Sequence, residues 1–257
     1  MSRNSGVMIQ SVARALEILE CFDDSTEILG ISEIAERMNL SKSTVFGLVN
    51  TLHNKGYLEQ EVMDKRYKLG IRLFELGHLY SLRLNIINEA MPYCEKLSKK
   101  YNATVHIGTR YANEIIYIAK VNRPDSFVVF SQVGKRAPLY CTGVGKGILA
   151  FLDEQEIRDY AYQTKYIKYT DNTISNATAL INELEKIRIN GYSTDSEEIV
   201  PGLRCVSAPI FDRNKKPIAA ISLSMIGNTM NDESVEIISK ELMSVTNQIS
   251  RRIGYQT

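Results

Sequence analysis

The chain has 257 residues, 31 lysines and arginines against 30 aspartates and glutamates, and 44% hydrophobic residues. Its length fits one large domain or two modest ones, and its composition excludes a wholly disordered protein. The net charge of +1 excludes a uniformly basic protein that coats nucleic acid, but it is compatible with a local basic face. No apolar run is long enough to span a membrane, and the N-terminus does not resemble a signal peptide. We therefore expect a cytoplasmic protein with no membrane partner.

The cysteines and histidines are scattered along the chain. The four cysteines form neither a CxxC pair nor a zinc-finger ladder: Cys21, Cys94, Cys141 and Cys205. The three histidines are equally far apart in the sequence. We therefore expect reduced thiols, no metal site and no cofactor.

Residues 10–100 follow a mostly helical pattern. In the first helix, four apolar residues recur at helical spacing and predict one buried face: Val12, Leu16, Leu19 and Phe22. A second, short helix is predicted to have Ser32 as its N-cap and Asn39 at its end.

A third helix is predicted to begin after Ser41, another N-cap, and to end at Gly56. Its apolar residues recur at helical spacing: Val45, Leu48, Val49 and Leu52. The tight corner at residues 38–41 joins the second and third helices into a helix-turn-helix. Residues 57–60 and 66–69 flank a polar turn and predict a β-hairpin, so this region has the pattern of a winged helix-turn-helix.

The third helix has the chemistry of a DNA-recognition helix. Residues 41–44, Ser-Lys-Ser-Thr, place small polar and basic groups at its start, where they can contact phosphates and base edges. Phe46 and Asn50 lie opposite its apolar face. Phenylalanine can contact a thymine methyl group, and asparagine can bond adenine with two hydrogen bonds.

The charge distribution favours the same interpretation. Residues 17–36 hold seven acids and no base, whereas residues 37–72 hold seven bases and three acids. Phosphate contacts need such a local positive field. The pattern alone leaves one alternative open, a helical bundle or protein-binding winged helix with a solvated charged face.

The second half of the chain predicts an α+β module, because β-rich stretches alternate with helical ones. Six stretches have the alternating or apolar pattern of half-buried strands: 103–109, 114–121, 126–133, 192–195, 205–211 and 217–225.

A glycine-rich turn, residues 142–147, opens an apolar helix that is predicted to run to Leu152. The free backbone N–H groups at such a helix start can hold a carboxylate or a phosphate. The turn is not a P-loop, because Tyr140 stands where the first glycine is required and Gly147 stands where Ser or Thr is required. The alternative is that the glycines only allow close packing of the helix on a sheet.

Serines on a predicted strand suggest a polar cavity. Ser222 and Ser224 point to one face of their strand with Ala220, and large apolar residues point to the other. Asp195 ends one strand and Cys205 begins another, so both can reach the same cavity. The alternative is that the serines face solvent and Cys205 fills the core.

Taken together, these residues resemble the IclR family of bacterial transcriptional regulators, nearly end to end. The matching segments in the first half are residues 11–16 (SVARAL), 41–46 (SKSTVF), 56–58 and 67–70. Those in the second half are residues 138–150, 170–174, 191–195, 197–198 and 202–210.

The resemblance implies an α+β protein in three parts: an N-terminal winged helix-turn-helix at residues 1–78, a linker helix at 79–87, and a GAF-like, profilin-like antiparallel-sheet effector domain at 88–257. It also implies dimers or tetramers on palindromic operators, and an organic acid bound at the glycine-rich helix start. Gly47 departs from the family's pattern, which commonly has Arg there. This glycine removes a DNA contact and weakens the helix by about 1 kcal/mol.

We therefore expect a DNA-binding regulator, and specifically a repressor, controlled by a small organic or sugar acid. The residues expected to contact the double-stranded operator are Arg14, Ser41, Lys42, Ser43, Thr44, Phe46, Asn50, Lys65 and Arg66. The residues expected to bind the effector are Thr142, Gly143, Val144, Asp195, Cys205, Ser222 and Ser224.

Two other classes of function remain to be weighed. One is a Cys- or Ser-dependent enzyme acting on a small acid, with Cys205 or Cys141 as nucleophile and His106 as base. The other is a redox- or metal-sensing regulator that uses the same two cysteines.

Overall fold

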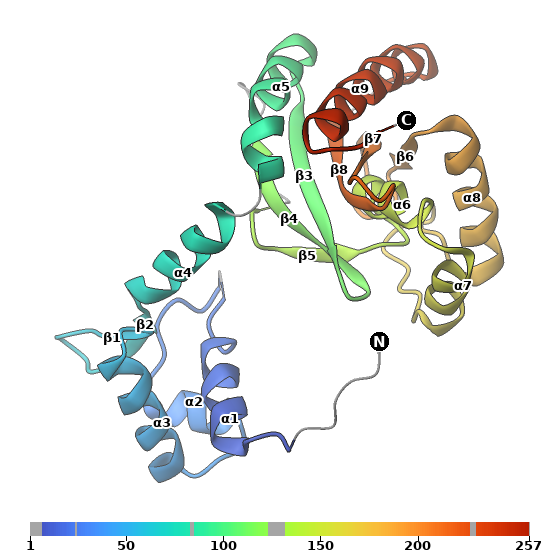
Figure 1. Ribbon diagram of the computed structural model, residues 1–257. Helices are drawn as coiled ribbons and strands as arrows, with labels where there is room; N and C mark the ends of the chain where they lie inside the picture. Colours follow the sequence, from blue (N-terminus) through green and yellow to red (C-terminus); the bar gives the residue numbers. More distant parts are fainter. Residues whose placement is uncertain (1–6, 24, 83–84, 123–131, 227–229, 257) are drawn as a thin grey trace. The chain divides into compact units, whose positions relative to one another are not determined.

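A computed structural model describes residues 7–23, 25–82, 85–122, 132–226 and 230–256 (Figure 1). The chain divides into two compact units, Met1–Arg83 and Leu84–Thr257. The division falls inside the segment predicted as a linker helix, residues 79–87. One helix ends there at Leu82 and another begins at Asn85. None of the helices in the described residues is long and apolar enough to cross a membrane.

The first unit is a winged helix-turn-helix. Its described elements are α1 (Gln10–Leu19), α2 (Ile31–Arg37), α3 (Lys42–Asn54), β1 (Leu58–Gln60), β2 (Tyr67–Leu69) and α4 (Ile71–Leu82). β1 and β2 pair antiparallel as the predicted hairpin. Ser41 caps α3, since its Oγ accepts a hydrogen bond from the Thr44 N–H at 3.2 Å. Gly56 adopts a left-handed conformation after α3, as expected for a residue that ends a helix.

Two details of the predicted helices are wrong. Gly30, not Ser32, is the N-cap of α2, because the Glu33 side chain reaches back and accepts a hydrogen bond from the Gly30 N–H at 2.6 Å. In α1, Val12 and Leu16 are exposed, at 55% and 56% of their surface. The core is instead formed by the adjacent face, which carries the fully buried Ile18.

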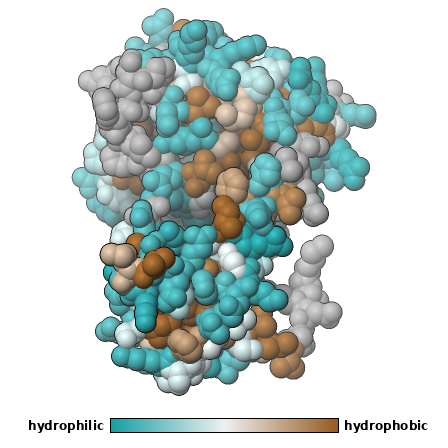
Figure 2. Space-filling model, turned by 90° about the vertical axis from the view of Figure 1, so that its left-hand side faces the viewer, coloured by the Kyte–Doolittle hydropathy of each residue, from teal (hydrophilic) through white to brown (hydrophobic). Residues whose placement is uncertain are grey.

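The first unit also exposes many large apolar side chains. On α4, whose side chains are described up to Tyr80, they are Ile71, Phe74, Leu76, Leu79 and Tyr80. Figure 2 shows hydrophobic side chains, in brown, reaching the surface among hydrophilic ones. An exposed apolar helix face of this kind is typical of an interaction surface.

The second unit is a three-layer α/β/α arrangement. Its described elements are α5 (Asn85–Tyr101), β3 (Thr104–Tyr111), β4 (Glu114–Val121), β5 (Arg136–Pro138), α6 (Gly143–Leu149), α7 (Glu154–Gln163), α8 (Ala177–Asn190), β6 (Ser193–Ser196), β7 (Leu203–Phe211), β8 (Pro217–Ile226) and α9 (Asp232–Arg252). The strands form one antiparallel sheet in the order β5-β4-β3-β8-β7-β6. Helices α5 and α9 pack on one face and α6, α7 and α8 on the other (Figure 1).

Five of the six predicted strands correspond to β3, β4, β6, β7 and β8 within two residues at each end. The sixth, residues 126–133, lies outside the described residues except at Gln132 and Val133, which belong to no strand. β5 was not predicted, since three residues are too short for a periodic signal. The glycine-rich helix α6 ends at Leu149 rather than Leu152.

The glycines of α6 let this helix pack closely on the sheet and on the segment that precedes it. A Cβ atom at Gly145 would lie 2.5 Å from the Leu139 carbonyl oxygen and 2.4 Å from Thr142 Oγ1. A Cβ atom at Gly147 would meet the hydroxyls of Ser193 and Ser207 at 3.0 and 3.3 Å. At Gly145 a side chain would collide with backbone, and at Gly147 it would crowd two hydroxyl groups. These contacts favour the alternative reading of the turn, in which the glycines allow close packing.

We expect Gly145→Ala to destabilise the second unit by about 1–3 kcal/mol, because the new methyl group collides with backbone. Gly147→Ala is the matched comparison on the same helix. It should cost less, since hydroxyl side chains can rotate away. Differential scanning calorimetry of both variants measures the effect, and equal losses would contradict this account of the packing.

Candidate functional site

The start of α3 presents polar groups to solvent. Lys42, Ser43 and Thr44 are exposed, as are Phe46 and Asn50 on the face opposite the buried valines of α3. The hydroxyls of Ser43 and Thr44 lie 3.0 and 2.8 Å from Ser41 Oγ, so a hydroxyl network covers the first turn. The predicted surface is therefore present as one continuous exposed face.

The wing carries less free positive charge than the sequence count indicates. Arg66 donates to both carboxylate oxygens of Glu33 at 2.9 Å and to the Ile28 carbonyl oxygen at 3.0 Å. Lys68 pairs with Glu61 at 2.6 Å. Lys65 is exposed in the turn, and Arg14 on α1 is partly exposed. Arg66 thus fastens the wing to α2.

In the second unit, a cavity of about 290 Å³ lies between the sheet and the loops around α6. Its lining includes all seven predicted effector residues: Thr142, Gly143, Val144, Asp195, Cys205, Ser222 and Ser224. As predicted, Ser222 and Ser224 share one face of β8, while Ile221 and Leu223 pack on the other face with α5 and α9. Strand and helix residues far apart in the sequence therefore meet at one site.

Two rows of polar residues cross the strands, and all of them except Ser193 and Ser207, which lie under Gly147 of α6, line the floor of the cavity. Residues directly paired across β6, β7, β8 and β3 form the first row, namely Asp195, Cys205, Ser224 and Thr104. The second row is formed in the same way across β6, β7, β8, β3 and β4, namely Ser193, Ser207, Ser222, His106 and Lys120. Thr104, Lys120 and the place of His106 in the lining could not be predicted from the sequence, because these positions depend on the register of β3 and β4.

The N-terminus of α6 lies over β6 and β7. A Cβ atom at Gly143 would lie 3.5 Å from Cys205 Cβ and 3.8 Å from Asp195 Cβ. Thr142 satisfies two N–H groups of the first turn: its Oγ1 accepts from Gly145 and its carbonyl oxygen from Lys146. The first N–H groups of an α-helix have no partner within the helix, so Gly143 and Val144 direct donors to this end of the cavity.

Asp195 is buried beside this helix start. Its Oδ1 accepts a hydrogen bond from the Glu198 N–H at 2.9 Å. Burial raises the pKa of Asp195 to about 6, against the opposing effects of that hydrogen bond, of Lys146 and of Cys205.

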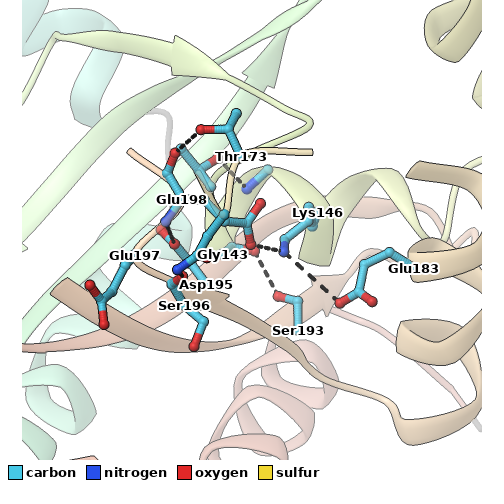
Figure 3. Close-up of polar contacts among 12 residues, drawn as sticks. Gly143, Lys146, Thr173, Glu183, Ser193, Asp195, Ser196, Glu197 and Glu198 are labelled. Carbon is cyan, nitrogen blue, oxygen red and sulfur yellow. Dashed lines mark hydrogen bonds and ion pairs between the residues drawn. The ribbon is translucent and has the colours of Figure 1, made fainter. Parts of the chain in front are cut away.

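Behind the cavity wall lies a buried ion pair that the sequence analysis did not predict (Figure 3). Lys146 on α6 donates to Glu198 Oε1, and Glu183 on α8 lies 4.0 Å from the same ammonium group. Among the described residues, Glu198 Oε2 is buried with no hydrogen-bond partner. Burial raises the pKa of Glu198 to about 7, although Lys146 opposes the rise.

The loop that carries Glu198 is held from a second side. Thr173 Oγ1 donates to the Glu198 carbonyl oxygen, and Thr170 Oγ1 donates to the Glu197 carbonyl oxygen, both at 2.6 Å. Both threonines belong to a matching segment of the sequence, residues 170–174, to which no role was assigned. They fix the loop whose next residues, Ile199 and Val200, line the cavity.

The comparisons with known proteins identify the family. Residues 11–62 match the IclR helix-turn-helix domain, and residues 78–251 match the family described as "Bacterial transcriptional regulator IclR C-terminal". The chain belongs to the IclR family of bacterial transcriptional regulators. Family membership identifies a DNA-binding regulator with an effector-binding domain rather than an enzyme.

The individual relatives agree over nearly the whole chain. The HTH-type transcriptional regulator XynR of Escherichia coli K12 is 34% identical over 96% of this chain and 98% of its own length. The HTH-type transcriptional repressor AllR of the same strain is 26% identical over 95% of this chain and 90% of its own length. The crystal structure of the Thermotoga maritima IclR protein is 36% identical, covers 96% of this chain and 100% of that one, and superposes with a TM-score of 0.79.

The surroundings of Cys205 and Cys141 in this IclR-family chain disfavour a nucleophilic role. Cys205 Sγ lies 3.2 Å from Ser224 Oγ, which in turn lies 3.5 Å from His106 Nδ1. Burial raises the pKa of the Cys205 thiol well above its usual range and lowers the pKa of His106 to about 4. Burial likewise raises the pKa of Cys141 to about 12. Both thiols therefore stay protonated, so little reactive thiolate is available for catalysis or oxidation.

The pH dependence of stability tests the buried pair. A carboxyl group whose pKa is raised on folding, from 4.5 to about 7 for Glu198, stabilises the fold fully below pH 4.5. That contribution is lost as the pH rises through about 7. The free energy of unfolding of Glu198→Gln, relative to that of the unmodified chain, should therefore rise by on the order of 1–3 kcal/mol between about pH 5 and about pH 8. Melting temperatures of both proteins across this pH range measure the change.

Glu185→Gln, which removes an exposed carboxylate from α8, controls for the loss of one charge. Asp195 and His106 remain in both proteins, so the difference between the profiles reports Glu198. Parallel melting profiles for the Glu198→Gln and Glu185→Gln variants would contradict the assignment.

Proposed function

We propose that this chain represses transcription and that a small organic or sugar acid in its cavity modulates operator binding. The observation that carries the proposal is the single cavity lined by all seven residues selected from the sequence. Its volume of about 290 Å³ is at the small end of the range of ligand pockets, about 300–1,000 Å³. Repression is supported by the similarity to AllR, which is named a repressor. Such a protein works in the cytoplasm.

The effector's acid group is proposed to bind the N–H groups of Gly143 and Val144, with Thr142 holding the turn in shape. Helix starts favour anions, because their N–H groups and the helix dipole point at the ligand. Ser222 and Ser224 then bond further oxygens of the ligand. Asp195 and Cys205, which lie beside the helix start, bond further oxygens of the ligand as well.

DNA binding is proposed to use the exposed face of α3. Lys42, Ser43 and Thr44 contact phosphates and base edges from its first turn, and Phe46 and Asn50 reach bases in the major groove. Contacts to the flanking backbone come from Lys65 in the wing and Arg14 in α1. Because Arg66 is already bonded to Glu33, its role is to hold the wing in place, with a phosphate as a further partner of its guanidinium group.

A homodimer, alone or paired into a tetramer, is proposed as the active form. The exposed apolar side chains of α1 and α4 support it, since Phe74 and Tyr80 leave 71% and 64% of their surfaces exposed in one chain. A second copy provides a matching apolar surface by symmetry. Two recognition helices then read two half-sites about one helical turn apart.

Regulation requires that the effector bind one arrangement of the dimer more tightly than the other, because equal affinity for both shifts nothing. The effector cavity belongs to the second unit and the recognition helix to the first. The dimer arrangement is therefore the element through which the two sites communicate in this proposal.

A thermal-shift screen of the full chain against small organic acids tests the cavity. An acid at 100 times its Kd adds about 2.7 kcal/mol of stability, a shift of several degrees. Ser222→Ala should weaken binding about tenfold or more, because it removes a hydrogen bond to a charged group. Ser244→Ala on the exposed surface of α9 is the matched control. If no acid shifts the melting temperature, the effector proposal fails.

The DNA surface is tested on an operator selected from random DNA. Lys42→Ala should weaken binding to all sequences and lower the salt slope by about 1, since it removes one phosphate contact. Asn50→Ala should lower the discrimination between bases at one position of the operator by about 1–3 kcal/mol. Lys55→Ala, at the far end of α3, should leave both quantities unchanged. If the Lys55→Ala variant alone lost sequence specificity, DNA would have to bind a surface other than the proposed face of α3.

A further inference from the structure

Tyr117 lines the cavity but is not among the seven residues to which effector binding has been assigned. It stands on β4, paired with Gly108 of β3. Its ring is partly buried against the hydrophobic cluster under α6 and packs on the ring of His106, with 5.1 Å between the ring centroids. Tyr117 is thus fixed at the cavity by contacts on two sides.

A β-bulge brings Tyr117 to the cavity face of the sheet. Ile107 pairs with Ala119, whereas the next residue, Gly108, pairs with Tyr117, so β4 holds one extra residue at this point. Side chains alternate along a regular strand, so Tyr117 and Lys120 would otherwise point to opposite faces. The extra residue lets both line the cavity. Bulges beside functional sites often re-aim a side chain in this way.

The hydroxyl of Tyr117 has no hydrogen-bond partner among the residues that the structure describes. A buried tyrosine hydroxyl usually finds such a partner. Two other tyrosines of this unit do so: the Tyr140 hydroxyl donates to the Ile167 carbonyl oxygen at 2.8 Å and accepts from the Ile167 N–H at 2.9 Å, and the Tyr166 hydroxyl donates to the Ala161 carbonyl oxygen at 2.8 Å. The hydroxyl of Tyr117 is therefore available to a molecule in the cavity.

This hydroxyl keeps its proton. Burial raises the pKa of Tyr117 well above its usual range, and Cys205 and Asp195 act in the same direction. These two residues stand on β7 and β6, so their effect indicates that the hydroxyl extends from β4 over the sheet toward them. A protonated phenol donates one hydrogen bond to a ligand oxygen.

Groups that donate and groups that accept hydrogen bonds stand together in this part of the cavity. Tyr117 donates, whereas Asp195, with a pKa of about 6, is largely ionised at neutral pH and accepts. Alcohol groups on a ligand can accept from the phenol and donate to the carboxylate. A hydrocarbon chain can do neither, so it would leave both polar groups unpaired.

We propose, on the basis of the effector role assigned to this cavity, that Tyr117 binds a hydroxyl group of the effector. It thereby selects hydroxylated acids over aliphatic acids of equal chain length. Ser222 and Ser224 line the same cavity and bond neighbouring oxygens of the ligand.

Two tyrosine variants separate a ligand contact from a structural one. Tyr117→Phe removes a hydroxyl without a protein partner, so the melting temperature of the ligand-free chain should stay within about 1 °C. Tyr140→Phe removes a hydroxyl with two protein hydrogen bonds and should lower the melting temperature by about 2–6 °C. An equal loss in both variants would show that the hydroxyl of Tyr117 holds the fold, and the proposal would be wrong.

Matched pairs of acids test the selection: glycerate with propanoate, xylonate with pentanoate, and gluconate with hexanoate. Their Kd values are measured by calorimetry on the full chain. At least one hydroxylated acid should bind about tenfold or more tightly than its aliphatic counterpart. Tyr117→Phe should weaken that acid about threefold to tenfold and leave the aliphatic acids within about twofold. Tyr162→Phe, an exposed position on α7, should change neither.

The outcomes distinguish this inference from the effector proposal on which it rests. If an acid binds and Tyr117→Phe leaves its Kd unchanged, Tyr117 does not bind the effector, and the effector proposal stands. The same conclusion follows if an acid without hydroxyl groups binds as tightly as any hydroxylated one. If no acid from these pairs or from the thermal-shift screen binds, both proposals fail.

Discussion

The close approach of α6 to the sheet is the constraint on which the second unit depends. Glycine at positions 143 and 147 lets the helix backbone come within van der Waals distance of β6 and β7, and Gly145 lets it pack on Leu139 and Thr142 in the segment before the helix. That contact places the helix start directly over Asp195 and Cys205, and it leaves a cavity beside the helix instead of a filled core. A side chain at Gly145 would collide with the Leu139 backbone before the helix, so the helix start and its backbone donors would have to shift.

The buried ion pair of Lys146 and Glu198 belongs to the same arrangement. The Lys146 side chain is buried between α6, α8 and the loop after β6. A buried ammonium group is costly without an anion, and Glu198 supplies one. The pair also fixes the loop whose backbone N–H, at Glu198, holds the Asp195 carboxylate. The anion that pairs with buried Lys146 therefore also fixes the loop that orients the Asp195 carboxylate in the cavity.

Local periodicity was enough to predict much of this architecture. The alternation of Ser222 and Ser224 with large apolar residues determined which face of β8 is polar, because side chains on a strand alternate with a period of two. Ser41 as an N-cap and the hairpin after α3 follow from equally local rules. In α1, by contrast, two adjacent faces both carry apolar residues. Periodicity alone could not decide between the face of Val12 and Leu16 and the face of Ile18.

What the sequence could not predict is long-range pairing. Arg66 counts as a free base in a charge tally, yet Glu33, 33 residues away, binds it. Lys146 and Glu198 are 52 residues apart, and His106 and Lys120 join the row of Ser222 only through the register of β3 with its neighbours. Each pairing changes the chemistry: it weakens the field of the wing, opposes the rise that burial causes in the pKa of Glu198, or brings a histidine and a lysine into the row of Ser222. The polar character of the site follows from local sequence, but which charged groups join it follows from the order of the strands.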